Sequence, residues 1–439
     1  MKKAIKTLLV ILCLFICVTL CGCSPFWGDA DSLLKAPKLT GELQPVQEAL
    51  EKAVGGKYSL KFPASGETKA AITLVDLDGD SQNEAVAFYS TSEDNTVTMH
   101  VAVLDVNDGV WQRTAEGKIV AGGVERVHFT DMDSDGVKEI IVGWNVYGAV
   151  EKTVSVYEYT GNALMGLIEE PYTAFLLCDL DNGFSSDLLT VYLDLSASSA
   201  TAKYFDVTPR GVSQLAARPI DGNVTAYYDP VLVKMQNGGY CVYLDCVKGA
   251  GLVTEVLYVE ENQLVAPFHD DVAKETILTY RPALVPCIDY DGDGNLEIPI
   301  MTEQPTEGDV SASAAYLTVW HSVQGDELLP KAYTLMNYSD GYTITLTREL
   351  AEKVATVRNL ENRERIVYDY DYEKDRFLGE LFRIRVVSKT AYDSGIYNDT
   401  YTVLSSNETQ VWLAKVSADA KKYGIDENKV REMFNIISN

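Results

Sequence analysis

The chain has 439 residues and a formal net charge of −27, from 64 acidic and 37 basic side chains. This length exceeds one ordinary hydrophobic core and predicts two domains behind a leader. The acidity disfavours binding to nucleic acids and anionic membrane surfaces, and it suits cations, basic partners or uncharged glycans, although solubility alone also explains it. Abundant tyrosine and scarce helical periodicity indicate β structure.

Residues 1–23 have the features of a secretory signal. Three lysines open the segment, and an apolar run from Thr7 to Leu20 follows. The run is shorter than the ~20 residues that span a bilayer. The sequence Leu20-Cys21-Gly22-Cys23 resembles a bacterial lipobox, which implies cleavage before Cys23 and attachment of a lipid to it. We therefore expect an extracytoplasmic protein anchored by lipid to the outer face of the cell membrane, with an uncleaved anchor or a plain signal peptide as alternatives.

Residues 24–57 are expected to form a tether and an N-terminal helix. The helix is predicted over 42–54, where the pair Gly55-Gly56 ends it. Its apolar residues share one face, so we expect it to pack on the domain that follows. These residues are Leu43, Val46, Leu50 and Val54.

From Tyr58 an acidic loop between two short strands recurs. The clearest copy is Asp131-Met132-Asp133-Ser134-Asp135-Gly136-Val137-Lys138-Glu139. Complete copies also begin at 76 and 289, whereas the copy at 179 has Gly183 in place of the third carboxylate and the copy at 234 begins with a lysine. A period of roughly 50–55 residues built from strands predicts a propeller or a solenoid, and about four strands per repeat favour propeller blades.

The loop composition is typical of a site that wraps one hard cation. Calcium takes six to eight oxygen ligands, and glycine at position 6 permits the tight turn. By analogy with EF-hand loops, the side chains at positions 1, 3, 5 and 9 and the carbonyl at position 7 would coordinate calcium as a structural cofactor. The predicted side-chain ligands are Asp76, Asp78, Asp80 and Glu84; Asp131, Asp133, Asp135 and Glu139; and Asp289, Asp291, Asp293 and Glu297.

Alternatives to metal binding remain at each loop. An EF-hand itself is excluded, because its twelfth position needs Glu and strands rather than helices flank these loops. An acidic turn held by Asx-type hydrogen bonds is the simpler interpretation. The loop at 179–187 has fewer ligands, and at 234–242 we expect no metal, because Lys234 takes the first ligand position and its ammonium stands in for the cation.

After about Leu335 the pattern predicts an α+β C-terminal domain over residues 336–439. A helical turn is expected within 347–354, and a closing helix begins with Asp426 as its N-cap. Strands are expected at 341–346, 355–358, 365–370, 381–388, 401–405 and 410–416.

The strand–loop–strand units resemble the FG-GAP/VCBS repeats of propellers like those of integrin α-subunits, over residues 58–335. This resemblance implies a mainly β fold with a propeller of at least five repeats, structural calcium, and a binding surface on the propeller face. The whole chain is similar to propeller lipoproteins of Gram-positive, Clostridia-like bacteria. The loops at 179–187 and 234–242 depart from the repeat pattern.

Few other residues indicate chemistry. Four cysteines follow Cys23 and are expected to be mainly buried free thiols, with a cross-strand disulfide as the alternative. His128, in a strand before a loop, is expected to be a packed or surface residue rather than a catalytic base, and His269 is expected to lie in a loop. The four cysteines are Cys178, Cys241, Cys246 and Cys287.

The sequence has no Gly-rich phosphate loop, HExxH, GxSxG or zinc-spaced Cys/His cluster. Our leading hypothesis is a non-catalytic surface module that presents a calcium-stabilised propeller to a protein or cell-wall glycan. One alternative is an envelope glycoside hydrolase or lyase, which needs two carboxylates ~5–9.5 Å apart on a concave face. The other is an envelope assembly or sensing protein that works through its C-terminal domain.

Overall fold

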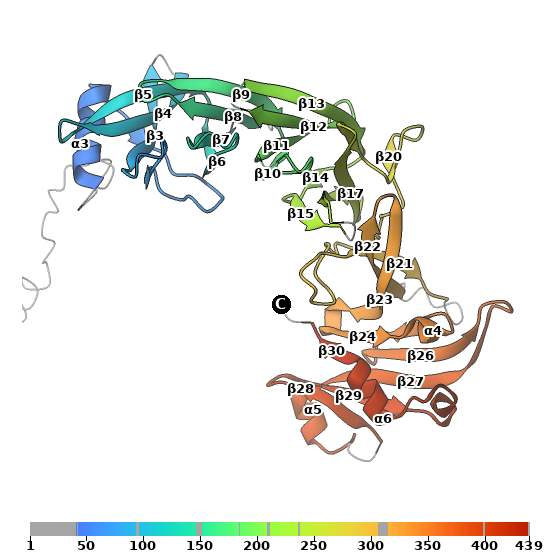
Figure 1. Ribbon diagram of the computed structural model, residues 1–439. Helices are drawn as coiled ribbons and strands as arrows, with labels where there is room; N and C mark the ends of the chain where they lie inside the picture. The colour runs from blue at the N-terminus through green and yellow to red at the C-terminus, as the bar shows by residue number, and fades with distance from the viewer. Residues whose placement is uncertain are drawn as a thin grey trace, which may run out of the picture.

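The computed structural model describes residue 41 and residues 43–93, 96–145, 152–183, 185–208, 211–235, 238–305, 315–397 and 400–437. The predicted leader, Cys23 and most of the tether lie outside the described residues. Figure 1 shows antiparallel sheets that follow one another from α3 to the C-terminal elements. No helix among the described residues is both long and apolar enough to cross a membrane.

Helix α3 (Leu43–Val54) ends where predicted, at Gly55, which has a left-handed φ of 65°. Val46 and Leu50 are fully buried against the first sheet, which confirms the predicted packing. That sheet has the order β1-β3-β4-β5, and β2 also pairs with β3. Its strands are β1 (Ser59–Leu60), β2 (Ile72–Val75), β3 (Glu84–Glu93), β4 (Thr96–Asn107) and β5 (Val110–Val120).

The second and third sheets are four-stranded meanders with their strands in sequence order. The second contains β6 (Gly123–Thr130), β7 (Glu139–Asn145), β8 (Lys152–Tyr159) and β9 (Leu164–Tyr172). The third contains β10 (Ala174–Cys178), β11 (Asp187–Asp194), β12 (Ser199–Thr208) and β13 (Gly211–Ile220).

The fourth sheet has the order β14-β16-β17-β18, with β15 also paired to β16, and a small hairpin, β19–β20, follows it. The fifth sheet has the order β21-β22-β23-β24-β30. The bounds are β14 (Ala226–Tyr227), β15 (Val231–Lys234), β16 (Tyr240–Lys248), β17 (Gly251–Glu260), β18 (Gln263–Val265), β19 (His269–Asp270), β20 (Glu275–Thr276), β21 (Ile298–Glu303), β22 (Tyr316–Gln324), β23 (Glu327–Asn337), β24 (Tyr342–Leu346) and β30 (Phe434–Ile436).

The last sheet has the order β25-β26-β27-β29-β28 and carries short helices. Asp426 caps the closing helix as predicted, by accepting a hydrogen bond from the Lys429 N–H. The bounds are β25 (Val354–Asn359), β26 (Glu364–Asp371), β27 (Arg376–Ser388), β28 (Thr402–Ser406), β29 (Gln410–Val416), η1 (Tyr338–Asp340), α4 (Arg348–Ala351), α5 (Lys389–Asp393), η2 (Ala418–Tyr423) and α6 (Glu427–Met433).

The core is divided into layers between successive sheets. Phe88 of the first sheet packs edge-on against Trp144 of the second, for example, and both are fully buried. Similar clusters join the second sheet to the third, the third to the fourth and the fourth to the fifth. Because a middle strand such as β7 is covered on both faces, nearly all of its residues are buried.

The prediction of a mainly β chain built from repeated blade-type sheets is confirmed. In Figure 1 these sheets follow an open arc and do not close into a ring, with the outer strands β5, β9 and β13 along one side. The predicted domain boundary at 335/336 falls inside β23, which pairs with both β22 and β24. The fifth sheet therefore joins the arc (residues 58–335) to the C-terminal unit (residues 336–437).

Candidate metal centres

The acidic loops at 76, 131 and 179 connect β2 to β3, β6 to β7 and β10 to β11, and the loop at 289 leads into β21. The carboxylate at position 9 is the first residue of the strand that follows the loop in the first three sheets, as Glu84, Glu139 and Asp187. In the fifth sheet Glu297 directly precedes β21. All four side chains are buried, whereas position 1 lies closer to the surface. Each loop thus has an exposed rim and a buried base.

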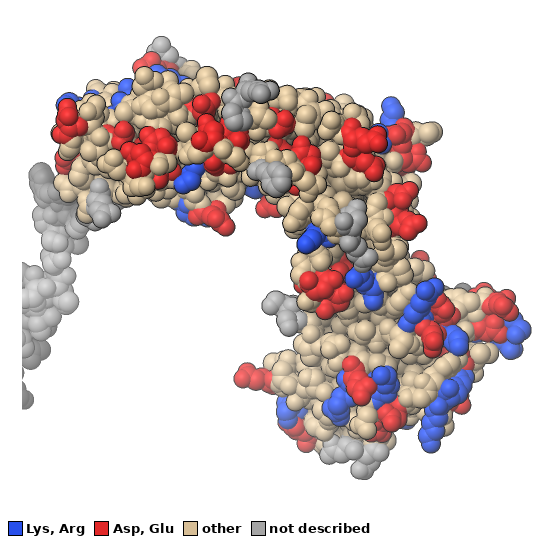
Figure 2. All heavy atoms as spheres, in the orientation of Figure 1, with Lys and Arg blue, Asp and Glu red and all other residues tan. Residues whose placement is uncertain are grey.

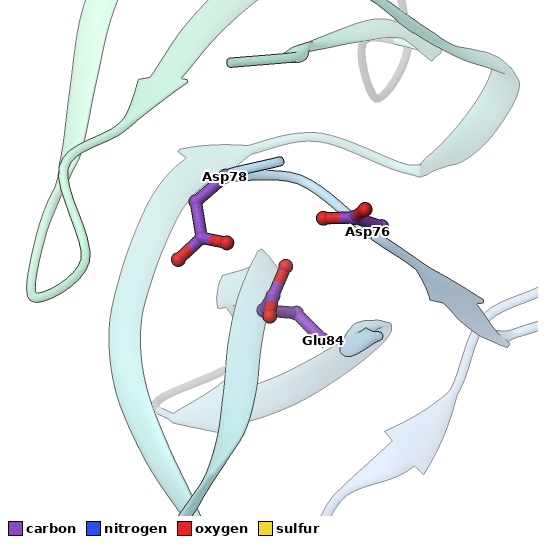
Figure 3. A group of neighbouring side chains, drawn as sticks. All are labelled: Asp76, Asp78 and Glu84. Atoms are coloured by element: carbon purple, nitrogen blue, oxygen red, sulfur yellow. The ribbon is translucent and has the colours of Figure 1, made fainter. Parts of the chain in front are cut away.

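The fold brings the carboxylates at positions 1, 3 and 9 together in four loops. One oxygen from each residue lies within 4.8 Å of the other two. Figure 3 shows Asp76, Asp78 and Glu84 turned toward one another. The other clusters are Asp131, Asp133 and Glu139; Asp179, Asp181 and Asp187; and Asp289, Asp291 and Glu297.

The predicted ligands at position 5 are not members of these clusters. Asp80, Asp135 and Asp293 instead accept hydrogen bonds from the backbone N–H at position 7, at 2.7, 2.8 and 2.9 Å. These are the Asx-type bonds of the alternative interpretation. Positions 1 and 3 also accept backbone bonds within the turn, for example Asp131 from the Gly136 N–H at 3.0 Å and Asp133 from the Asp135 N–H at 3.2 Å. Position 5 therefore only shapes the turn, whereas positions 1 and 3 shape it and also join the position-9 carboxylate in the cluster.

Position 9 has the same backbone partner in the three complete loops. The N–H of position 2 donates to Oε2 of Glu84 and Glu139 at 2.7 Å, and to Oε2 of Glu297 at 2.8 Å. The other oxygen, Oε1 of Glu297, is buried and has no hydrogen-bond partner among the described residues. A buried carboxylate oxygen without a donor fits a bound cation, because leaving it unpaired is costly.

Electrostatic repulsion within a loop is visible in the pKa values. Burial raises the pKa of Glu139 to about 7, and the nearby charges of Asp133, Asp135 and Asp131 raise it further. Burial also raises the pKa values of Glu84 and Glu297, with contributions from the acids of their own loops. A divalent cation at the cluster would reverse this effect by favouring the ionised carboxylates.

The left-handed backbone explains the glycine at position 6. Gly136 and Gly294 have φ values of 95° and 91°, which glycine adopts at little cost. In the first loop Ser81 has a φ of 72° at the same position, which costs free energy for a residue with a Cβ. The loop geometry is therefore kept even where the sequence departs from the pattern.

The third loop shows a compensated substitution that sequence reasoning missed. Asp187 is one methylene shorter than Glu and does not accept a hydrogen bond from the backbone N–H of position 2, which is Leu180. The Tyr204 hydroxyl bridges the gap by accepting from the Leu180 N–H at 2.9 Å and donating to Asp187 Oδ2 at 2.5 Å. Only strand pairing places Tyr204 there, so the linear sequence gave no signal for it.

Adjacent loops are joined by backbone hydrogen bonds. The N–H of Lys138, at position 8 of the second loop, donates to the Leu77 carbonyl of the first loop at 2.7 Å. The N–H of Ser186, at position 8 of the third loop, donates to the Met132 carbonyl of the second at 2.9 Å. Since position 2 also contacts the position-9 carboxylate in the first two loops, each cluster is linked to the next blade.

The fourth repeat has a different composition. Lys234 ends β15 and is exposed, and it lines a cavity of about 30 Å³ together with Asp293 and Glu297 of the fifth loop. At position 9 the fourth repeat has Val242, which pairs with Leu257. This repeat therefore has an apolar pair where the other repeats have a carboxylate.

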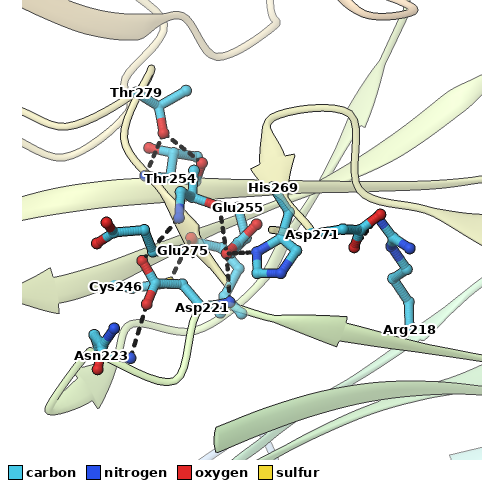
Figure 4. A network of polar contacts seen from close by, with 12 residues as sticks. Arg218, Asp221, Asn223, Cys246, Thr254, Glu255, His269, Asp271, Glu275 and Thr279 are labelled. Carbon is cyan, nitrogen blue, oxygen red and sulfur yellow. Dashed lines mark hydrogen bonds and ion pairs between the residues drawn. The ribbon is translucent and has the colours of Figure 1, made fainter. Parts of the chain in front are cut away.

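A second polar cluster joins hairpin β19–β20 to the fourth sheet (Figure 4). Glu255 Oε1 accepts hydrogen bonds from the Asp221 N–H and the Thr276 hydroxyl, both at 2.8 Å. Nδ1 of His269 lies 3.9 Å from the same oxygen. His269 was expected in a loop but is buried at the start of β19, and burial lowers its pKa. His128 packs in β6 as expected, edge-on against Phe175.

This cluster is enclosed by protein. Glu255 and Asp221 are fully buried, and burial raises the pKa of Glu255 to about 7. Asp221 is neutralised by Lys248, whose Nζ lies 2.6 Å from its Oδ2 and 2.8 Å from Glu275 Oε2. Such buried groups attach the hairpin to the sheet and are out of reach of a polymeric substrate.

One pair of carboxylates from different sheets shares an arginine. Arg126 joins Glu125 and Asp229, with nitrogen–oxygen distances of 2.8 and 2.9 Å. Burial acts to raise the pKa of Glu125, but hydrogen bonds from Arg126 and Ser65 outweigh it and the pKa is lowered. A glycosidase needs a general acid with a raised pKa, so this pair has the properties of a structural ion pair.

The four cysteines after Cys23 are free thiols, as expected. Cys178, Cys241 and Cys246 are buried and Cys287 is partly buried. Burial raises their pKa values, so they are poor nucleophiles and poor metal ligands at neutral pH.

No protein-family model matches the sequence, and no curated protein matches it. Among solved structures, the chain is similar to the exotype rhamnogalacturonan lyase YesX, with 11% identity and a TM-score of 0.31 over 73% of this chain and 83% of the lyase. It is also similar to a periplasmic gluconolactonase of Pseudomonas aeruginosa, with 13% identity and a TM-score of 0.28 over 72% and 85%. A third is an exo-β-1,3-galactanase of Phanerochaete chrysosporium, with 10% identity and a TM-score of 0.26 over 82% and 89%. At these TM-scores the similarities give no argument for an activity.

Proposed function

We propose that this chain is a calcium-stabilised surface protein that binds a protein or glycan partner without catalysing a reaction. It is attached to the outer face of the cell membrane by lipid on Cys23, and its arc consists of FG-GAP/VCBS-type repeats. The observation that carries the proposal is the recurrence of one cluster, with the same backbone bond to Glu84, Glu139 and Glu297. Carboxylate oxygens are the ligands that calcium prefers.

The chemistry of the clusters favours a stabilising role for the cation. Three carboxylates with oxygens within 4.8 Å repel one another at neutral pH. A cation that binds only the folded loop stabilises it by mass action, and extracellular calcium is abundant enough for sites of modest affinity. The loops also contact neighbouring blades through Lys138 and Ser186, so bound calcium would stabilise the arrangement of the blades.

The surface charge indicates the class of partner. Figure 2 shows acidic side chains gathered along the arc, whereas Lys and Arg are more frequent over the C-terminal unit. Such an arc repels nucleic acids and anionic lipids and suits a basic protein surface or an uncharged glycan. The lowered pKa of Glu125 and the enclosure of Glu255 favour this binding role over a glycosidase.

The test is a pull-down with the full chain immobilised and exposed to envelope extract, in millimolar calcium and in EGTA. The proposal predicts a defined partner that is retained with calcium, lost with EGTA, and lost in the triple variant E84Q/E139Q/E297Q. Glu361→Gln, an exposed acid outside the loops, is the matched control and should retain the partner. If nothing is retained and a carbohydrate in the extract is shortened, the protein is an enzyme and the proposal is wrong.

A further inference from the structure

One residue of each repeat lies directly opposite the position-9 carboxylate and differs between repeats. Strand pairing matches Ala85 with Leu104, Ile140 with Tyr157 and Leu188 with Phe205. Position 9 directly precedes Ala85, Ile140 or Leu188. The residue opposite it directly follows Leu104, Tyr157 or Phe205 in the next strand. Continued by one residue, this register places Glu84 opposite Asp105, Glu139 opposite Glu158, and Asp187 opposite Asp206.

These opposite residues add a negative charge to the first three loops. Side chains directly opposite in an antiparallel pair share one face of the sheet and have Cβ atoms about 4.5–5.5 Å apart. Like charges in opposite positions destabilise a sheet, and a bound cation would relieve that repulsion.

The fifth loop has no acid opposite position 9, and a lysine lies beside its carboxylates. Ile298 pairs with His321, so Glu297 lies opposite Ser322, which carries no charge. Nζ of Lys331 lies 3.6 Å from Asp293 Oδ2 and 3.9 Å from Asp291 Oδ2. Ser322, Lys331 and Lys234 line the 30 Å³ cavity beside Glu297. The unpartnered, fully buried Oε1 of Glu297 still marks a place for a cation in this loop.

We infer that the residue opposite position 9 sets the calcium affinity of each loop, and that the fifth loop is the weakest and most readily exchanged site. This inference rests on the proposed function. Ser322 removes one negative charge from the fifth site, and Lys331 places a competing cation at its rim. The first and second loops hold calcium permanently, whereas the fifth loop, next to the C-terminal unit, is the one that responds to changes in calcium concentration.

Two aromatic rings at the fifth loop can report the binding of a luminescent metal ion there. Tyr290 occupies position 2, and its ring stacks on Trp320 at a centroid distance of 4.8 Å. Terbium bound in this loop is therefore sensitised by adjacent aromatic rings, and the component of luminescence that disappears in Glu297→Gln belongs to this site. Calcium competition against that component gives the affinity of the fifth loop in the full chain.

The decisive variant is Ser322→Asp, which restores the acid that the first three repeats have. At a partly exposed site the added charge should tighten calcium binding at the fifth loop by roughly tenfold. Ser322→Asn, of the same shape without the charge, should leave the affinity unchanged. Lys331→Met should tighten binding by roughly threefold, and Lys353→Met, a lysine of the C-terminal unit that contacts Tyr423, should have no effect.

The reciprocal change is Asp105→Asn in β4, opposite the first loop. It should weaken calcium binding at the first loop by roughly tenfold. If Ser322→Asp and Ser322→Asn give the same affinity, or if Lys331→Met leaves the affinity unchanged, the inference is wrong while calcium binding itself stands. If calcium fails to displace terbium from the unmodified loops, the proposed function fails instead. Lys331→Met keeps the test decisive if Ser322→Asp does not fold.

Discussion

The arc and the C-terminal unit neutralise their acidic residues in different ways. Of the 64 acidic and 37 basic residues, residues 336–439 contain 17 and 15. There the buried Glu364 lies 3.4 Å from Arg383 and 3.1 Å from Arg385. In the first two loops of the arc the clustered carboxylates accept hydrogen bonds mainly from backbone N–H groups. Among the described residues, no lysine or arginine forms an ion pair with them. The clustered carboxylates of these loops are therefore compatible with a bound cation, whereas Glu364 already has basic partners.

Chelation should produce the largest effect and should separate the two regions. In EGTA we expect the free energy of unfolding of the arc to fall by about 2.7 kcal/mol for each site at which the calcium concentration had been one hundred times the Kd. The C-terminal unit should keep its stability. Hydrogen exchange resolved by peptide measures both regions in one sample. Equal loss of protection in both regions, or in neither, would contradict the comparison.

A substitution that creates a cavity in the core of the C-terminal unit should destabilise the protein equally with and without calcium. Leu381 is fully buried in the core that β27 shares with β24 and α6, so Leu381→Ala should lower the free energy of unfolding by about 2–5 kcal/mol. The loss should be the same with calcium and with EGTA, as denaturant melts monitored in both buffers will measure. A calcium-dependent loss would show that the two regions are coupled through the fifth sheet.

The fourth sheet should respond to pH rather than to calcium. The pKa of Glu255 is raised to about 7, so its contribution to stability is present at acidic pH and is lost as the pH rises through that value. Glu255→Gln should remove this loss, which is on the order of 3 kcal/mol between pH 4.5 and 7.5.

The charged groups around Glu255 define the window for that experiment. Asp221 adds to the raised pKa of Glu255, and Lys248 opposes it. The pKa of His269 is lowered, so its contribution to stability is lost as the pH falls below about 6.5, opposite in sign to that of Glu255, and the Glu255→Gln variant separates the two. Melts of both proteins across the window are the measurement, and parallel pH profiles would refute the assignment.

The third loop should lose stability when its bridge is removed. Tyr204→Phe deletes the hydroxyl that joins the Leu180 N–H to Asp187 and leaves both buried, at a cost of about 1–3 kcal/mol. Tyr240→Phe in strand β16 is the matched control and should change stability less. Equal losses in thermal melts would show that the bridge has no special role.

The smallest expected effect is a gain in the first loop. Ser81 has a left-handed φ of 72°, so Ser81→Gly should stabilise the protein by up to about 1 kcal/mol. Ser185→Gly, in the third loop and outside the positions with positive φ, should not stabilise it. A loss of stability in Ser81→Gly would mean that the serine side chain contributes more than its backbone strain costs.

Short-range pattern predicted much of this molecule. Alternating Asp residues before a strand located the loops, the helical stripe located α3, and Asp426 located the start of α6. Cross-strand features were not predictable, because Tyr204, Asp105 and Ser322 are brought to their loops by strand register across hairpins of different length. The open arc also depends on packing between sheets, which the repeat period does not specify.

The most direct test of the account is calcium titration of the full chain by calorimetry. The account predicts saturable binding that includes the three complete loops, with one site lost in each of Glu84→Gln, Glu139→Gln and Glu297→Gln, and none lost in Glu361→Gln. Absence of calcium binding, or binding that all three loop substitutions leave unchanged, would contradict it.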